Sequence, residues 1–181
     1  MAILKNGGVD MSFKLSWKVH VLCFLISFVF CFLTQKYLSI LFINILFENK
    51  MLSITGNIIL NLYIFILIIF IPLTFFHEVM HGAAYKIFGG KVKYGFKGLY
   101  AYAQETSGIA LSRTEFLIVL LAPVTCISVI SMLIPGNIGG MVFFLNLLSS
   151  MGDLLMSFYL CKTHENSRII DKSYGFDVIE N

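Results

Sequence analysis

The amino-acid sequence predicts an all-α membrane protein with about four transmembrane helices. Of its 181 residues, 58% are hydrophobic and only 13% are charged, and the mean hydropathy is +0.87. Soluble domains are typically about 45–50% apolar and about 25% charged. Four separate runs are also apolar over a length that can cross about 30 Å of hydrocarbon. The chain is too short for more than one domain, so residues 1–181 are expected to form a single membrane-embedded unit.

Each predicted span is an apolar run. In chain order the runs are Trp17–Thr34, Ile58–Phe76, Phe116–Ile134 and Ile138–Leu160. The first run is slightly short, and no small-residue cleavage site follows it, so we expect it to remain as a transmembrane helix rather than a signal peptide. The second is expected to continue as a helix to about Phe88.

A further stretch, Tyr37–Phe47, is apolar but too short to span the bilayer. Its length favours an interfacial or re-entrant helix.

Local signals mark several helix ends. Ser112-x-x-Glu115 is a capping box that opens the third span. Gly89-Gly90 is expected just past the end of the second helix, because glycine suits the left-handed conformation of a helix C-terminus. Pro135-Gly136-Asn137 predicts a tight turn, and therefore a short loop, between the third and fourth spans.

The segment Lys91–Gln104 differs from the apolar runs because it is rich in aromatic residues and alternates weakly. Two interpretations are open. The segment is either a short β-hairpin at the cytoplasmic interface or an irregular aromatic loop anchored at the lipid headgroups.

The distribution of basic residues predicts the orientation of the chain. With a cytoplasmic N-terminus and four spans, 11 of the 13 lysine and arginine residues lie on the cytoplasmic side, and only Lys36 and Lys50 do not. Cytoplasmic loops carry such an excess in membrane proteins. We therefore expect a multi-pass protein of the plasma membrane with both termini in the cytoplasm.

Five residues at the end of the second run, His77-Glu78-Val79-Met80-His81, carry the clearest chemical signal. They form the pattern H-E-x-x-H. On a helix, residues four apart lie on one face, so His77 and His81 can bind the same ion. Glu78 is then placed to act as general base on a metal-bound water. The pattern predicts a zinc site with a catalytic glutamate, embedded in a membrane helix.

A catalytic zinc ion needs a third protein ligand, and Asp153 is the candidate after the motif that lies within an apolar span. A charged residue in such a place is rare and costly, so it calls for a functional reason. Val79, midway between the histidines, and Asp153 both lie roughly 12–14 Å inside the expected cytoplasmic boundary. The three side chains can therefore meet at one depth. The alternative is an aspartate that pairs with an arginine or lines a water cavity.

Asn146 precedes Asp153 by seven residues and is expected on the same helix face, beside Ser149, Ser150 and Gly152. It is a candidate for binding substrate or orienting a ligand. The alternative is an amide that packs two helices together.

The cysteines and the other histidines are not expected to bind metal. The four cysteines form no CxxC pair, which argues against a disulfide frame or a zinc knuckle. His20 lies near the first interface and His164 lies in the polar tail, and neither is expected to bind metal.

Four features together resemble the DUF3267 family of zincin peptidases, and more distantly the site-2 proteases. The features are the HEVMH helix, the loop Gly89–Phe96, Leu121-Ala122-Pro123 in the third span and Ser150-Met151-Gly152-Asp153 in the fourth. The resemblance covers roughly Phe65 to the C-terminus. The chain lacks the Asn-x-x-Pro and Leu-Asp-Gly patterns of site-2 proteases and has no PDZ domain.

The resemblance implies a membrane zinc metalloprotease in which His77, His81 and Asp153 bind Zn²⁺ and Glu78 is the base. By analogy with site-2 proteases, Lys91–Gln104 is expected to pair with an extended substrate. The expected partners are the lipid bilayer and a protein or peptide substrate, with no nucleic acid.

Two other classes of function remain open. A catalytically inactive zinc-binding scaffold or regulator would use the same ligands, although a structural site needs no base such as Glu78. A metal transporter would need polar or charged residues along a whole pathway, and the outer halves of the second and third spans have no charged residue.

Overall fold

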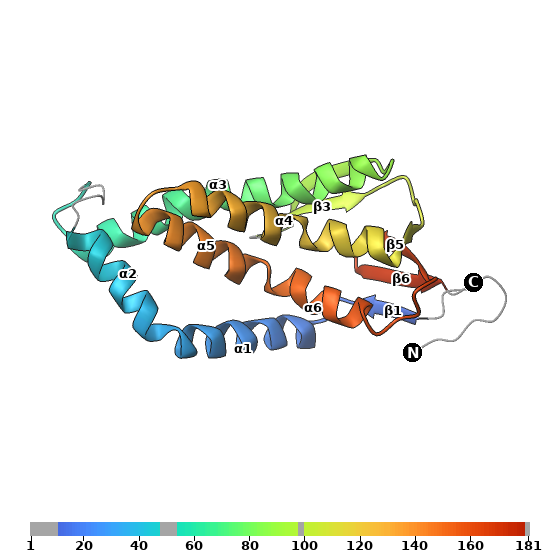
Figure 1. The fold of residues 1–181 in the computed structure, drawn as a ribbon, viewed down its shortest axis with the longest axis horizontal. Helices are drawn as coiled ribbons and strands as arrows, with labels where there is room; N and C mark the ends of the chain where they lie inside the picture. The colour runs from blue at the N-terminus through green and yellow to red at the C-terminus, as the bar shows by residue number, and fades with distance from the viewer. Residues whose placement is uncertain (1–10, 48–53, 98–99, 180–181) are drawn as a thin grey trace.

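The computed structural model describes residues 11–47, 54–97 and 100–179. Within them, long helices run side by side and short strands gather at one end of the bundle (Figure 1). The helices are α1 (Trp17–Leu33), α2 (Gln35–Phe47), α3 (Ile58–Ile87), α4 (Arg113–Leu133), α5 (Asn137–Ser149) and α6 (Met151–Leu160). The strands are β1 (Met11–Lys14), β2 (Val92–Lys97), β3 (Tyr100–Glu105), β4 (Leu111–Ser112), β5 (Arg168–Lys172) and β6 (Gly175–Ile179).

The prediction of an all-α fold was wrong, because the chain also forms two small antiparallel sheets. One has the strand order β1-β6-β5-β4, so β1 near the N-terminus pairs with β6 near the C-terminus. These strands have two to five residues and come from segments far apart in the chain. Such short strands leave little periodicity in the sequence. Two of these strands, β5 and β6, lie in the polar tail that follows α6.

The second sheet is the hairpin of β2 and β3, which confirms the hairpin interpretation of Lys91–Gln104. Its register pairs Val92 with Glu105 and Lys97 with Tyr100. The hairpin packs against the end of α3.

Two helices, α3 and α4, are each long and apolar enough to cross a membrane. The other candidate spans are bent pairs: α1 and α2 meet at 72°, and α5 and α6 meet at 50°. The described residues therefore hold two to four spans. The bend after α1 explains why Tyr37–Phe47 is helical but leaves the line of the first span.

The prediction of one continuous helix over Ile138–Leu160 was wrong, because the helix breaks at Ser150. Just before the break, the Ser149 hydroxyl donates to the carbonyl of Asn146 at 2.9 Å. Serine side chains that bond to the preceding turn in this way bend helices.

The predicted helix ends are confirmed. The Ser112 hydroxyl accepts from the Glu115 N–H, and the Glu115 carboxylate accepts from the Ser112 N–H at 2.7 Å. Helix α3 ends at Ile87, and Gly89 follows with a φ of 83°. Gly136, in the turn before α5, has a φ of 73°, a conformation that glycine adopts without strain.

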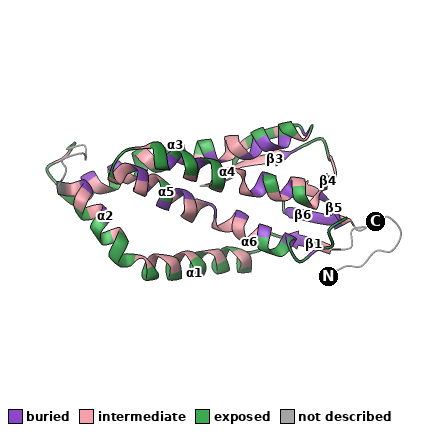
Figure 2. Ribbon diagram, viewed as in Figure 1, coloured by how far each residue is buried: buried purple, intermediate pink, exposed green. Residues whose placement is uncertain are grey.

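Two apolar cores lie at opposite ends of the bundle. The larger core joins the four-stranded sheet to α3, α4 and α6 and includes Phe13, Tyr85, Phe116 and Phe176. The smaller core joins α2, α3 and α5 through Leu41, Ile45, Phe65 and Met141. Helix α1 has no buried residue and is green and pink along its length in Figure 2.

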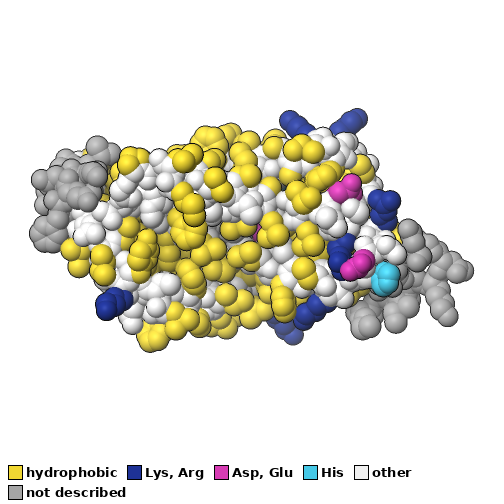
Figure 3. Space-filling model, in the orientation of Figure 1, with side chains coloured by type: hydrophobic (Ala, Val, Ile, Leu, Met, Phe, Trp, Pro, Cys, Tyr) yellow, Lys and Arg dark blue, Asp and Glu magenta, His cyan; other side chains and the backbone are white. Residues whose placement is uncertain are grey.

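Charge is separated from apolar surface. Figure 3 shows hydrophobic side chains over the body of the bundle and most of the charged side chains at the end with the sheets. Exposed lysines at that end include Lys14, Lys86, Lys93 and Lys162. The pairing of β1 with β6 brings both ends of the described chain to this same end. Lys5 and Lys50, part of the predicted charge pattern, lie outside the described residues.

Candidate metal centre

The last third of α3 holds two buried histidines on one face. His77 and His81 are 5% and 8% exposed, and their ring centroids lie 5.0 Å apart. The helical spacing of four residues accounts for this pairing. The predicted motif is therefore helical, and both of its histidines point inward.

Asp153 completes a cluster with the two histidines. Its Oδ2 atom lies 3.0 Å from Nε2 of His77 and 3.5 Å from Nε2 of His81. The side chain is buried and belongs to the first turn of α6. The break at Ser150 thus gives this carboxylate a helix N-terminus, where the helix dipole favours negative charge.

The three donor atoms fit a zinc ion. The ligand atoms of the cluster all lie within 4.8 Å of one another. Nitrogen and oxygen ligands bound at about 2.0–2.2 Å to a tetrahedral zinc stand about 3.3–3.6 Å apart, close to the distances between Asp153 and the histidines. Two imidazoles and one carboxylate are also a known ligand set for catalytic zinc, in which water takes the fourth position.

The two histidines differ in their second ring nitrogen. Nδ1 of His81 lies 2.9 Å from the backbone carbonyl oxygen of Val119 in α4. Nδ1 of His77 is buried and has no hydrogen-bond partner among the described residues. Only His81 is therefore fixed by the protein on both sides of its ring.

Glu78 lies beside the cluster and faces the hairpin. It is partly buried, and its carboxylate lies near the backbone of Ala103 in β3. It also interacts electrostatically with His77, His81 and Asp153. The predicted base is therefore close to the predicted ligands but outside the three-residue cluster.

A glycine allows the hairpin to lie this close to the motif. A Cβ atom on Gly82 would be 1.9 Å from the hydroxyl oxygen of Tyr94 in β2. Any larger residue at this position would collide with the tyrosine. Gly82 follows the motif directly, but its role was not predicted, because the contact depends on how the hairpin folds back.

Asn146 does not share a helix face with Asp153 as predicted, because the break at Ser150 places the two residues in different helices. Asn146 is fully buried, and its Nδ2 donates to the Val124 carbonyl at 3.3 Å and to the Ser128 hydroxyl at 3.4 Å. These contacts join α5 to α4.

His20 and His164 are exposed, and neither belongs to the three-residue cluster. All four cysteines are free. None of them is part of the cluster among the described residues.

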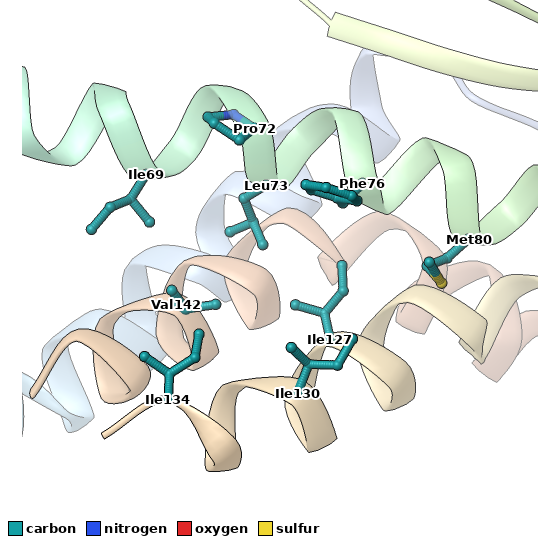
Figure 4. Close-up of a pocket in the computed structure, with 9 residues that line it drawn as sticks. All are labelled: Ile69, Pro72, Leu73, Phe76, Met80, Ile127, Ile130, Ile134 and Val142. Carbon is teal, nitrogen blue, oxygen red and sulfur yellow. The ribbon is translucent and has the colours of Figure 1, made fainter. Parts of the chain in front are cut away.

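An apolar groove runs along α3 and α4 and reaches the HEVMH motif of α3 at Met80 (Figure 4). It encloses about 280 Å³. Its lining is wholly apolar: Ile69, Pro72, Leu73, Phe76, Met80, Ile127, Ile130, Ile134 and Val142.

A polar junction ties the motif helix to both sheets. Asp171 in β5 accepts a hydrogen bond from the Glu105 N–H of β3 at 2.9 Å, and it also interacts electrostatically with Tyr85 at the end of α3. Burial raises the pKa of the Asp171 carboxyl to about 6. No local sequence pattern indicates this junction, because its members come from three separate segments.

Glu105 is held by its own loop. Its carboxylate accepts from the backbone N–H groups of Lys91, Ser107 and Gly108 at 2.6–3.1 Å, and from the Ser107 hydroxyl. Burial would raise the pKa of this carboxyl, but the hydrogen bonds from Ser107 and the backbone outweigh burial and lower it.

The HEVMH helix and the buried histidine–histidine–aspartate cluster place the chain in the class of zincin-type proteins. Residues 68–168 match the DUF3267 family, described as "Putative zincin peptidase", and the chain belongs to this family. The matched segment contains all three residues of the cluster and Glu78. No curated protein and no solved structure matches the chain, so the likeness to site-2 proteases stays a prediction.

Proposed function

We propose that this protein is a membrane-embedded zinc metalloprotease that hydrolyses peptide bonds of a membrane or membrane-proximal substrate. The observation that carries the proposal is the buried cluster of His77, His81 and Asp153 on a helix long and apolar enough to span a membrane. Membership of a zincin peptidase family supports the same reading.

In this proposal His77, His81 and Asp153 hold the metal, and Glu78 is the general base. A bound zinc ion would polarise the scissile carbonyl and lower the pKa of a water molecule. Glu78 accepts the proton of the attacking water and returns it to the leaving amine. Glu78 lies beside β3, near the backbone of Ala103.

The surroundings of the cluster support a peptide substrate. One edge of β3 pairs with β2, and Glu78 lies near β3. An extended peptide that paired with the other edge of β3 would therefore lie near the base. Apolar side chains of the substrate would bind in the groove that ends at Met80, beside the HEVMH motif. Both features favour a substrate that enters from the membrane or its surface.

The proposed location is the plasma membrane, with both termini cytoplasmic. Most of the described lysine and arginine residues, though not Lys36, gather at the end of the bundle that holds both terminal strands, and cytoplasmic segments are enriched in such residues. The cluster lies nearer to this end, so water would reach it from the cytoplasm.

The test compares wild type with Glu78→Gln in detergent-purified protein. We expect about one zinc ion per chain in both, because Glu78 is not a ligand. Cleavage of a fluorogenic peptide library should fall by about 100-fold or more in the variant, since general bases contribute about 10²–10⁴ to the rate. Glu165→Gln, the same change at an exposed position, is the matched control and should keep full activity.

Two outcomes would contradict the proposal. Full cleavage by Glu78→Gln would remove the glutamate from the mechanism. Stoichiometric zinc without cleavage of any library peptide by wild type would favour a zinc-binding scaffold.

A further inference from the structure

Helix α4 contains a proline whose position bears on the metal centre. Pro123 is fully buried in the interior of this helix. Proline has no backbone N–H, so it cannot donate to the carbonyl four residues before it. In α4 that carbonyl belongs to Val119, which is itself fully buried.

The carbonyl that Pro123 leaves without its helical donor is the one that His81 contacts. Nδ1 of His81 lies 2.9 Å from the Val119 oxygen, and both groups are buried. A buried carbonyl without a partner would be costly, and here a histidine of the motif takes the place of the missing N–H.

This contact decides which ring nitrogen of His81 faces the cluster. A carbonyl oxygen only accepts hydrogen bonds, so Nδ1 must carry the proton and donate it. The other nitrogen, Nε2, then points to Asp153, whose Oδ2 lies 3.5 Å away. Hydrogen bonds that the second ring nitrogen donates fix the orientation of metal-binding histidines in this way.

We propose that Pro123 is a positioning residue of the metal centre: by withholding its N–H, it frees the Val119 carbonyl to hold His81 with Nε2 toward the ligand cluster. The inference extends the proposed zinc site and rests on it for its consequence in metal binding. The hydrogen bond itself is a property of the metal-free protein and is tested separately.

Pro72 in α3 is the matched control. It also lies in the interior of a long apolar helix. Pro72 is exposed, lines the apolar groove, and lies four residues after Ile68, which faces outward. Replacing either proline by alanine restores one backbone N–H, but only at position 123 does that N–H compete with His81.

The first measurement is zinc affinity, by competition with a chelator, for wild type, Pro123→Ala and Pro72→Ala. We expect Pro123→Ala to weaken binding by about 10- to 100-fold, the usual effect of losing a partner of a ligand histidine. Pro72→Ala should stay within about twofold of wild type. If Pro123 only shapes α4, its variant will change the melting temperature of the protein and leave zinc affinity unchanged, which would overturn the proposal.

The second measurement follows the Nδ1-bound proton of His81 by NMR of metal-free, ¹⁵N-histidine-labelled protein, with the resonance assigned by a His81→Gln variant. We expect a hydrogen-bonded proton in wild type and Pro72→Ala, and at least about tenfold faster exchange with water in Pro123→Ala. Equal exchange in all three proteins would overturn the proposal. Because this readout needs no zinc and no cleavage, it separates failure of the inference from failure of the proposed protease function.

Discussion

The two parts of α3 belong to one continuous helix but have very different surroundings. In its first nineteen residues, Ile58–Phe76, only Asn61, Phe65 and Leu73 are buried. In its last eleven residues, His77–Ile87, five are buried, including both histidines and Gly82. Figure 2 shows strand β3 of the hairpin lying beside this second part. One helix therefore provides both a largely exposed apolar surface and an enclosed polar site.

The difference comes from what packs against each part. The second part meets the β2–β3 hairpin, the carboxylate of Asp153 from α6 and the carbonyl of Val119 from α4. Buried polar groups are stable only when such partners are present. A hydrophobic helix can therefore hold ionisable residues where other elements enclose it, and substitutions that change this enclosure should disturb the site or the fold.

The largest effect is expected from Asp153→Ala, which removes the only carboxylate of the cluster. Zinc affinity should fall by more than about 100-fold, beyond the usual effect of losing a residue that only orients a ligand. The measurement is chelator competition in detergent. Asp177→Ala removes another buried carboxylate, one that accepts from Tyr174 in the sheet, and should change zinc affinity only a few-fold. Equal losses in both variants would mean that Asp153 acts through folding.

A smaller effect is expected from Asp171→Asn at the junction of the sheets with α3. The pKa of Asp171 is raised from 3.8 to about 6, so the folded protein holds this proton more tightly than the unfolded chain does. Its favourable contribution is complete below about pH 4 and is lost as the pH rises through about 6. The variant lacks this titration, so its stability relative to wild type should rise by about 2 kcal/mol between pH 4 and pH 7.

Thermal unfolding of the metal-free proteins at several pH values measures this difference. The groups that face Asp171 are Tyr85, Glu105 and the backbone of Lys172. Glu165→Gln, at an exposed position, should follow wild type at each pH. A constant difference between Asp171→Asn and wild type from pH 4 to pH 7 would contradict the raised pKa.

The smallest effect is expected from Gly82→Ala, which adds a methyl group where the Tyr94 hydroxyl lies. The tyrosine is partly exposed and can move, so we expect a loss of about 1 kcal/mol, at the low end for overpacking. Combining Gly82→Ala with Tyr94→Leu should recover most of this loss, because the collision is then absent. Unfolding measurements on the two single variants and the double variant give the coupling; strictly additive losses would mean that the hairpin does not rest on Gly82.

Local patterns carried the predictions that were confirmed. The apolar runs located α3 and α4, the Ser112–Glu115 capping box located the start of α4, and Gly89 located the end of α3. These features depend on neighbours within a few residues, so the sequence displays them directly. The break at Ser150 was missed because Ser149 bonds to its own helix, and an apolar run does not reveal whether such a bond bends the helix.

The sequence alone determined that this chain has membrane-length apolar helices and that His77 and His81 share a helix face, because hydrophobic length and a spacing of four residues are properties of one segment. Tertiary structure decided what surrounds those histidines. It brings Asp153 from α6, the Val119 carbonyl from α4, and the hairpin over Gly82 from β2 and β3. It also pairs β1 with β6 across the whole length of the chain. These contacts join distant segments through packing and hydrogen bonds, and local periodicity carries no record of such partners.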